Sequence, residues 1–284
     1  MENYDAIIAS TNFTKLSTEE WIQKKKEERE SLYSMAEQMA NEVLSSPEKL
    51  NQYLQLQANL GKASTRNVLL TFAQKPEATF ILSAEEWGER GRGIRRGEGS
   101  KAIKQFRADK EYTKENGDVV MGYKVERCFD VSQTYGNPTS ERASVGMPMR
   151  SKIKALMKDT AVPVKLSEKV PQNLGALYSE KEDTIFVAPN MEGEALFFTV
   201  ARELARADGC DSTFLCECAA SVTCRRFGIE PKPINDIPAD CVVMDSKDKR
   251  SLLDEVREAA TELNTRIDRN LYAERLQKKE QPER

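Results

Sequence analysis

Histidine is absent from the 284-residue sequence. Without imidazole, the chain has no Ser-His or Cys-His catalytic pair, no His-liganded zinc site and no His-based pH switch. Long apolar runs are missing too: nowhere do about 18 apolar residues follow one another, so we expect no membrane-spanning helix. The net charge of −3 argues against a uniformly basic nucleic-acid binder but leaves room for a local basic patch.

The first residues lack a basic segment followed by an apolar core, so we expect no secretion signal and a cytoplasmic protein. The six cysteines are then expected to be reduced. Four of them have spacings unlike the C-x-x-C pairs of structural zinc sites: Cys210, Cys216, Cys218 and Cys224. We interpret them as buried, inert thiols and expect neither metal nor cofactor.

Apolar periodicity predicts an α+β protein with two domains. The first domain, 1–135, begins with helices and continues with strands: helices at 17–44, from Pro47 onward and at 64–74, then strands at 78–82 and 119–131. Residues 136–149 are rich in Gly, Pro and Ser, which is typical of a linker. The second domain, 150–284, combines both element types: helices at about 150–159, 192–208, 212–227 and 247–279, and strands at 162–167 and 184–188.

One basic, glycine-rich segment stands out within the first domain. Its cations outnumber its single acidic residue, Glu98, by seven to one: Arg90, Arg92, Arg95, Arg96, Lys101, Lys104 and Arg107. Glycines at 91, 93, 97 and 99 permit close approach of a phosphate chain, and arginine binds phosphate in bidentate fashion. Trp87 and other nearby aromatics offer stacking surfaces for a single strand. The alternative interpretation is a solvated loop whose aromatics belong to the core.

Several short motifs occur together between about residues 60 and 136. They are the N-V-L-L helix, P-x-A-T, a single Trp, the R-x-G-E turn and the F-D-V-S-Q-T ending. In this combination the stretch resembles the amino-terminal domain of the ArdC-type antirestriction proteins. That domain binds single-stranded DNA in the family, whose members travel on plasmids and other conjugative elements.

The resemblance implies DNA contacts for seven residues of this sequence: Arg66, Asn67, Trp87, Arg92, Arg95, Arg96 and Lys101. Composition alone adds Arg90 and Lys104 to the nucleic-acid-binding set.

The second half presents a hairpin (GALYSEKEDTIFVAP), a helix ending FFTVARELARADG, a helix carrying CECAASVTCRRFGIEP and a long last helix. This order resembles the zincin-like metallopeptidase domain of the same family. Active members carry H-E-x-x-H in the first of these helices, where two histidines bind zinc and the glutamate activates water. The resemblance implies that Arg202, Glu203, Leu204, Ala205 and Arg206 occupy the motif, and that Glu217 occupies the position of a further ligand.

Arginine replaces both histidines of that motif, and a guanidinium has no lone pair to give a metal. We therefore predict an inactive pseudoenzyme without catalytic residues. Three interpretations of Arg202 and Arg206 remain open: a polar helix face, an ion-pair cluster with Glu203 and Glu217, or an anion site. We favour the ion-pair cluster, because a half-buried guanidinium needs acidic partners.

Two functions from different classes follow. The first is a non-enzymatic single-stranded-DNA-binding protein of a mobile element, active in antirestriction or conjugation. The second is an interaction module whose peptidase-like cleft holds a protein partner without cutting it. A residual enzyme using Glu203 with a substrate-held metal is a third, weaker reading.

Overall fold

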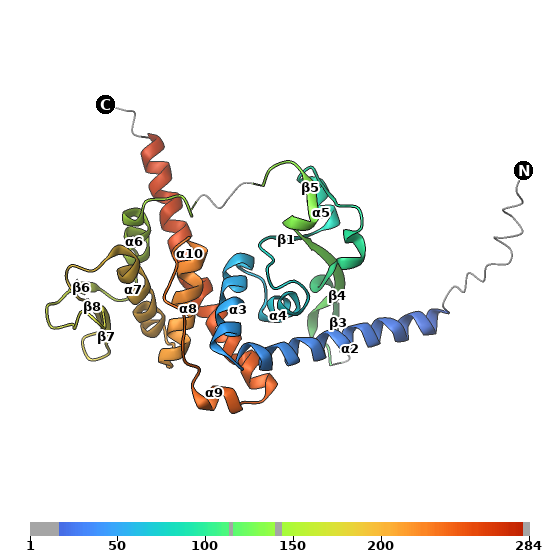
Figure 1. The fold of residues 1–284 in the computed structure, drawn as a ribbon, viewed down its shortest axis with the longest axis horizontal. Helices are drawn as coiled ribbons and strands as arrows, with labels where there is room; N and C mark the ends of the chain where they lie inside the picture. Colours follow the sequence, from blue (N-terminus) through green and yellow to red (C-terminus); the bar gives the residue numbers. More distant parts are fainter. Residues whose placement is uncertain (1–16, 114–115, 140–143, 281–284) are drawn as a thin grey trace, which may run out of the picture.

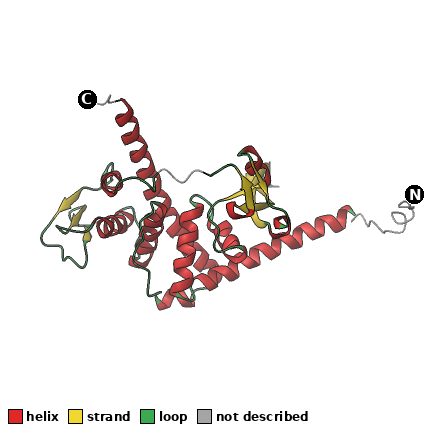
Figure 2. Cartoon of the chain, turned by 45° about the horizontal axis from the view of Figure 1, so that its top comes forward, coloured by secondary structure: helices red, strands yellow, loops and turns green. Residues whose placement is uncertain are grey.

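The protein is described by a computed structural model that covers residues 17–113, 116–139 and 144–280. Two groups of strands lie on either side of a central set of helices, and one long helix extends beyond the second group (Figure 2). Within the described ranges no helix is both long and apolar enough to cross a membrane.

Three helices open the described chain, as the sequence predicts (Figure 1): α2 (Thr18–Val43), α3 (Pro47–Leu60) and α4 (Thr65–Gln74). Each begins at a serine whose side chain accepts a hydrogen bond from a backbone N–H of the first turn: Ser17, Ser46 and Ser64. Ser17 and Glu20 form a reciprocal capping box. Capping and apolar spacing together explain why these boundaries were predictable.

The strands of this half form two small antiparallel sheets. The larger has the order β1–β4–β3, from β1 (Ile81–Ser83), β4 (Val119–Asp130) and β3 (Ile103–Thr113). The smaller pairs β2 (Arg92–Ile94) with β5 (Thr134–Gly136), and the short helix α5 (Ala84–Glu89) follows β1. The β2–β5 pair was not predicted, because glycine and arginine give these segments no apolar alternation.

The second half matches the predicted order of elements. Its helices are α6 (Met149–Met157), α7 (Gly193–Ala207), α8 (Thr213–Arg226), α9 (Ala239–Val243) and α10 (Ser246–Glu280). Its strands are β6 (Val164–Leu166), β7 (Ala176–Ser179) and β8 (Thr184–Val187), with β8 central, parallel to β6 and antiparallel to β7. The one-turn helix α9 was not predicted, since it is too short to show a period.

The two halves pack against each other through α3, α8 and α10. The helix α10 contacts α6 and α8 as well as α2, and α3 contacts α8. One apolar core runs through both halves. The Asn51 side chain adds polar contacts by bonding the Ile234 backbone, donating to the carbonyl at 2.8 Å and accepting from N–H at 3.1 Å. A division into domains at 136–149 remains a prediction.

Trp87 belongs to a separate small core with Leu82 and Phe129. Its side chain is 0% exposed, and its Nε1 donates to the Phe129 carbonyl oxygen at 2.9 Å. A ring enclosed in this way offers no face to a nucleic-acid base. The stacking role expected for Trp87 is therefore corrected: its indole holds α5 against the sheet.

We predict that Trp87→Ala lowers the free energy of unfolding by about 3–5 kcal/mol, because it leaves a cavity and removes the Nε1 hydrogen bond to the Phe129 carbonyl. The matched Trp21→Ala substitution should change it by less than about 0.5 kcal/mol, since Trp21 is 54% exposed. Urea denaturation of both variants checks this. Equal losses of stability would contradict the assignment.

Candidate functional site

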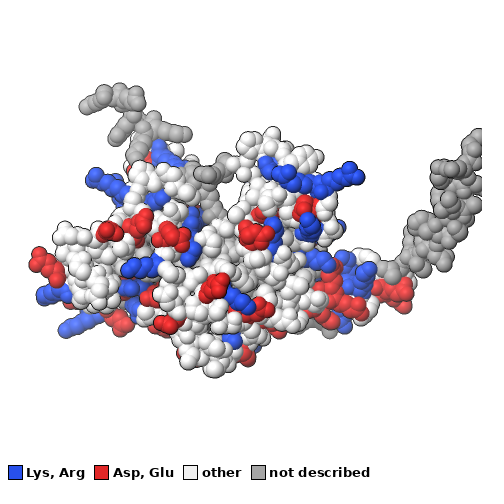
Figure 3. Space-filling view, in the orientation of Figure 1, with Lys and Arg blue, Asp and Glu red and all other residues white. Residues whose placement is uncertain are grey.

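The basic segment runs from the end of α5 through β2 and a 3-10 turn (Glu98–Lys101) into β3. Figure 3 shows Lys and Arg side chains projecting at this end of the molecule, over α5 and β5. Gly97 precedes the turn with a φ of 85°, a left-handed conformation that glycine adopts without a steric cost. The segment is thus a shaped loop between strands.

Gln133 fixes this loop in place. Its backbone carbonyl accepts from the Arg95 N–H at 2.9 Å, and its Nε2 donates to the Lys101 carbonyl at 3.0 Å and to Glu98 Oε2 at 3.1 Å. The Gln133 side chain is buried, so these bonds are shielded from water. Sequence reasoning assigned Gln133 no role of its own, although it lies within the F-D-V-S-Q-T motif.

Asp130 of the same motif orders the start of the sheet. Its carboxylate accepts hydrogen bonds from the backbone N–H groups of Thr79 at 2.7 Å, Phe80 at 3.0 Å and Ser132 at 2.9 Å. Burial acts to raise the pKa of Asp130, but the hydrogen bonds from Ser132, Phe80 and Thr79 outweigh it and lower that pKa. The F-D-V-S-Q-T motif therefore orders the sheet that carries the basic loop.

Arg95 and Arg96 are exposed at the tip of the loop. Among the residues that the structure describes, their side chains form neither a hydrogen bond nor an ion pair. Arg90 is also exposed and lies over the Phe80 ring at 5.3 Å. Lys101 pairs with Glu98 at 2.8 Å but its side chain remains 68% exposed. These four cations can meet a ligand without breaking the fold.

Other predicted contacts are occupied by the chain itself. The guanidinium of Arg92 donates to Thr134 Oγ1 at 2.8 Å and to the Asn137 carbonyl, and lies over Trp87. The Asn67 side chain bonds both backbone groups of Phe106, at 2.8 and 2.9 Å. The Asn67 and Arg92 side chains therefore join secondary-structure elements, and a DNA contact of either residue stays a prediction.

Arg66 and Lys104 likewise have partners within the protein. Arg66 lies 4.8 Å from the centre of the Tyr33 ring, and Lys104 forms an ion pair with Glu28 at 2.7 Å. The Lys104 side chain is 43% exposed, so the ion pair is open to water and to competing anions.

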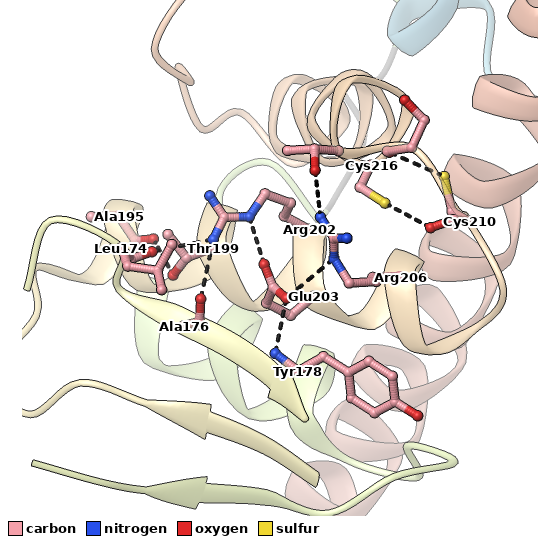
Figure 4. Close-up of polar contacts among 12 residues, drawn as sticks. Leu174, Ala176, Tyr178, Ala195, Thr199, Arg202, Glu203, Arg206, Cys210 and Cys216 are labelled. Carbon is pink, nitrogen blue, oxygen red and sulfur yellow. Dashed lines mark hydrogen bonds and ion pairs between the residues drawn. The ribbon is translucent and has the colours of Figure 1, made fainter. Parts of the chain in front are cut away.

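The second candidate site lies on α7, where Arg202, Glu203 and Arg206 meet (Figure 4). Glu203 is 2% exposed. Arg202 Nε lies 2.7 Å from Glu203 Oε1, and Arg206 Nε lies 3.6 Å from Glu203 Oε2. The predicted ion-pair cluster is confirmed for these three residues.

The cluster ties α7 to its neighbours (Figure 4). The backbone N–H of Tyr178 in β7 donates to Glu203 Oε2 at 2.9 Å. Arg202 donates to the Ala176 carbonyl at 3.1 Å, also in β7, and Arg206 donates to Thr213 Oγ1 at 2.8 Å at the start of α8. Three secondary-structure elements thus converge on one buried carboxylate.

Glu217 does not join this cluster, which corrects the expected four-residue arrangement. Neither arginine forms an ion pair with Glu217 in the described structure. Both guanidinium groups face Glu203 instead, and Arg206 also donates to Thr213. The sequence pattern correctly places Glu217 on the helix after α7, but it cannot show which carboxylate pairs with the two arginines.

The cysteines are free thiols in this structure. Burial raises the pKa of Cys218 and of Cys224, because desolvation disfavours the thiolate. Within the described ranges no group of three or more Cys, Asp or Glu side chains is placed to hold a metal ion. This arrangement fits the interpretation of Cys218 and Cys224 as inert thiols.

Neither a protein-family model nor a curated protein matches the chain. Among solved structures, the Mn(II)-bound antirestriction protein ArdC from the R388 plasmid superimposes with a TM-score of 0.50 at 18% sequence identity. The match covers 78% of this chain and 98% of the ArdC chain. The chain has the ArdC fold. Metal-free ArdC from R388 matches with a TM-score of 0.42 at 19% identity, over 74% of this chain and 84% of that chain.

The ArdC fold agrees with the resemblance predicted from the sequence motifs. The neighbour's Mn(II) site is a property of that protein. In this chain, two protonated guanidinium groups occupy the space around the buried carboxylate of Glu203, and they have no lone pair for a metal. The residues present therefore do not fit a divalent cation.

We predict that Glu203→Gln lowers the free energy of unfolding by about 3–5 kcal/mol, because it leaves two guanidinium groups without their counter-charge. Glu217→Gln serves as the matched control and should change stability by less than about 0.5 kcal/mol. Thermal and urea unfolding of the two variants measure the difference. A Glu203→Gln protein as stable as the wild type would show that the cluster contributes nothing.

Proposed function

We propose that this chain is a non-enzymatic, single-stranded-DNA-binding protein with an inactive peptidase-like half, serving antirestriction or a conjugation-linked step. The observation that carries the proposal is the pair Arg95 and Arg96, which are exposed and have no side-chain partner among the described residues, on a loop that Gln133 holds in place. The antirestriction role of the structural neighbour supports the biological part of the proposal.

Phosphate capture needs cations that are free before the ligand arrives, and preorganisation lowers the entropic cost of binding. Arg95 and Arg96 meet both conditions. Stacking would come from Tyr135 instead of Trp87, because Tyr135 is 58% exposed and pairs with Gly93 across β2 and β5. Sequence reasoning passed over Tyr135, since its exposure follows from the unpredicted strand pair.

The proposal that the second half lacks peptidase activity rests on the chemistry of the Glu203 carboxylate. A general base must present a free oxygen to water. In Glu203, Oε1 faces Arg202, and Oε2 accepts from the Tyr178 N–H and faces Arg206. We infer that Glu203 activates no water and that the chain hydrolyses no peptide.

A second candidate function is a protein-interaction module, which one observation favours. The strand β7 lies at the edge of its sheet beside the cluster, and its Leu177 side chain is 45% exposed. An edge strand with an exposed apolar side chain can pair with an extended peptide. This function predicts a stable protein complex and little affinity for DNA.

The double variant Arg95→Glu/Arg96→Glu should bind a fluorescently labelled thymidine oligonucleotide at least about tenfold more weakly than the wild type, since two phosphate contacts become repulsive. Lys165→Glu/Lys181→Glu is the matched control, because it makes the same change in net charge at exposed positions of the other half. Fluorescence anisotropy measures both. Equal affinities of the two double variants would remove the loop from the binding site.

Introducing histidines at positions 202 and 206 tests whether the arginines are what prevents zinc binding. Arg202→His/Arg206→His recreates H-E-x-x-H, in which residues four apart share a helix face, and should take up about one zinc ion per chain. The wild type and the control Arg202→Gln/Arg206→Gln should take up none after dialysis. Stoichiometric zinc in the wild-type protein, measured by atomic emission, would refute the pseudoenzyme assignment.

A further inference from the structure

A second basic surface lies outside the glycine-rich segment, between α2 and β4. Here a groove of about 500 Å³ is lined by four cations together with Trp21: Lys25, Lys26, Arg29 and Lys124. No acidic side chain is among the described residues that line it. Three of these cations belong to the segment KKKEERE at 24–30, in which basic and acidic residues are mixed along the sequence.

Helix geometry aligns Trp21 with two of these cations. Trp21, Lys25 and Arg29 are spaced four residues apart, so they form one stripe along α2. The guanidinium of Arg29 donates to the Tyr123 carbonyl of β4, which fixes the helix against the strand. Lys124 then completes the groove from the side of the sheet.

The three lysines stay available to an anion, and Arg29 is exposed with only one of its nitrogens donating to Tyr123. Lys25 pairs with Glu28 at 2.9 Å, Lys26 with Glu30 at 4.0 Å and Lys124 with Glu126 at 3.5 Å. The lysine side chains in these pairs are 52%, 68% and 52% exposed, so water screens each attraction. A polyanion that contacts several of them at once can displace these single partners.

Trp21 adds a stacking surface. Its side chain is 54% exposed, an unusual position for an indole on a charged helix. Trp21 and Lys25 also line a neighbouring hollow that includes Lys104, the residue where the basic segment enters β3. Glu27 and Glu28 line the hollow as well, so its charges are mixed, and it connects the groove with the start of β3.

We propose that the groove between α2 and β4 is a second contact for the same single strand, with a base stacked on Trp21 and phosphates on Lys25, Lys26, Arg29 and Lys124. Unpaired bases expose the faces that an indole stacks on, whereas in a duplex they are stacked on one another. An acidic peptide would satisfy the charges but leave the indole without a planar partner. This inference rests on the proposed DNA-binding function.

The two tryptophans of the chain make the proposal directly measurable, because Trp21 is exposed and Trp87 is 0% exposed. Titration with an unlabelled thymidine oligonucleotide should quench the red-shifted emission of Trp21. In Trp21→Phe only the buried Trp87 remains, and the quenching should disappear. Anisotropy of a labelled oligonucleotide follows binding independently in the same samples.

Affinity provides the second readout. Trp21→Ala should weaken binding about tenfold, and Lys26→Glu should weaken it several-fold. Lys154→Glu on α6 is the matched control, since it also reverses an exposed lysine on a helix, and it should leave affinity unchanged. Urea denaturation confirms that each variant is folded.

The outcomes separate the two proposals. Binding with quenching that requires Trp21 supports both. Binding of the oligonucleotide without quenching, or with equal affinities for Lys26→Glu and Lys154→Glu, overturns the groove and leaves the loop as the binding site. Absence of binding in the wild type overturns the proposed function and the groove together.

Discussion

The buried carboxylate of Glu203 is the physical constraint that organises the second half of this protein. A charge that is 2% exposed has to be compensated, and two guanidinium groups from the same helix compensate it. The arrangement joins β7, α7 and α8 by side-chain bonds. Glu203 and its two arginines therefore stabilise the contacts between these elements.

The proposed DNA contacts lie in the other half of the molecule, in the basic glycine-rich segment. There, the buried side chains of Asp130 and Gln133 bond mainly to backbone groups and order the basic loop, at whose tip Arg95 and Arg96 are exposed. Buried polar residues order the sheet and the loop, and the exposed arginines of the loop face the solvent. Arginine side chains therefore differ between the two halves. Arg202 and Arg206 are paired with a buried carboxylate, whereas Arg95 and Arg96 are exposed to solvent.

Much of the architecture was predictable, because capping serines mark the first three helices and apolar spacing marks the longer helices of both halves. The elements that escaped prediction, the β2–β5 pair and α9, are short and lack a period. For the site, sequence identified the basic segment and the arginine pair of α7. It could not distinguish an enclosed indole from an exposed one, so Trp87 was assigned a surface role and Trp21 none. Burial depends on contacts between segments far apart in sequence, such as Trp87 with Phe129.

The salt dependence of binding to single-stranded and duplex DNA by the wild-type protein tests the central claim most directly. If several phosphates are neutralised, the logarithm of the association constant should fall linearly with the logarithm of salt concentration, with a slope of about −0.7 for each phosphate contacted on a single strand. We expect a slope equivalent to several contacts and tighter binding of the single strand than of the duplex. Binding that is absent at low salt, or that is insensitive to salt, would contradict the electrostatic capture of DNA.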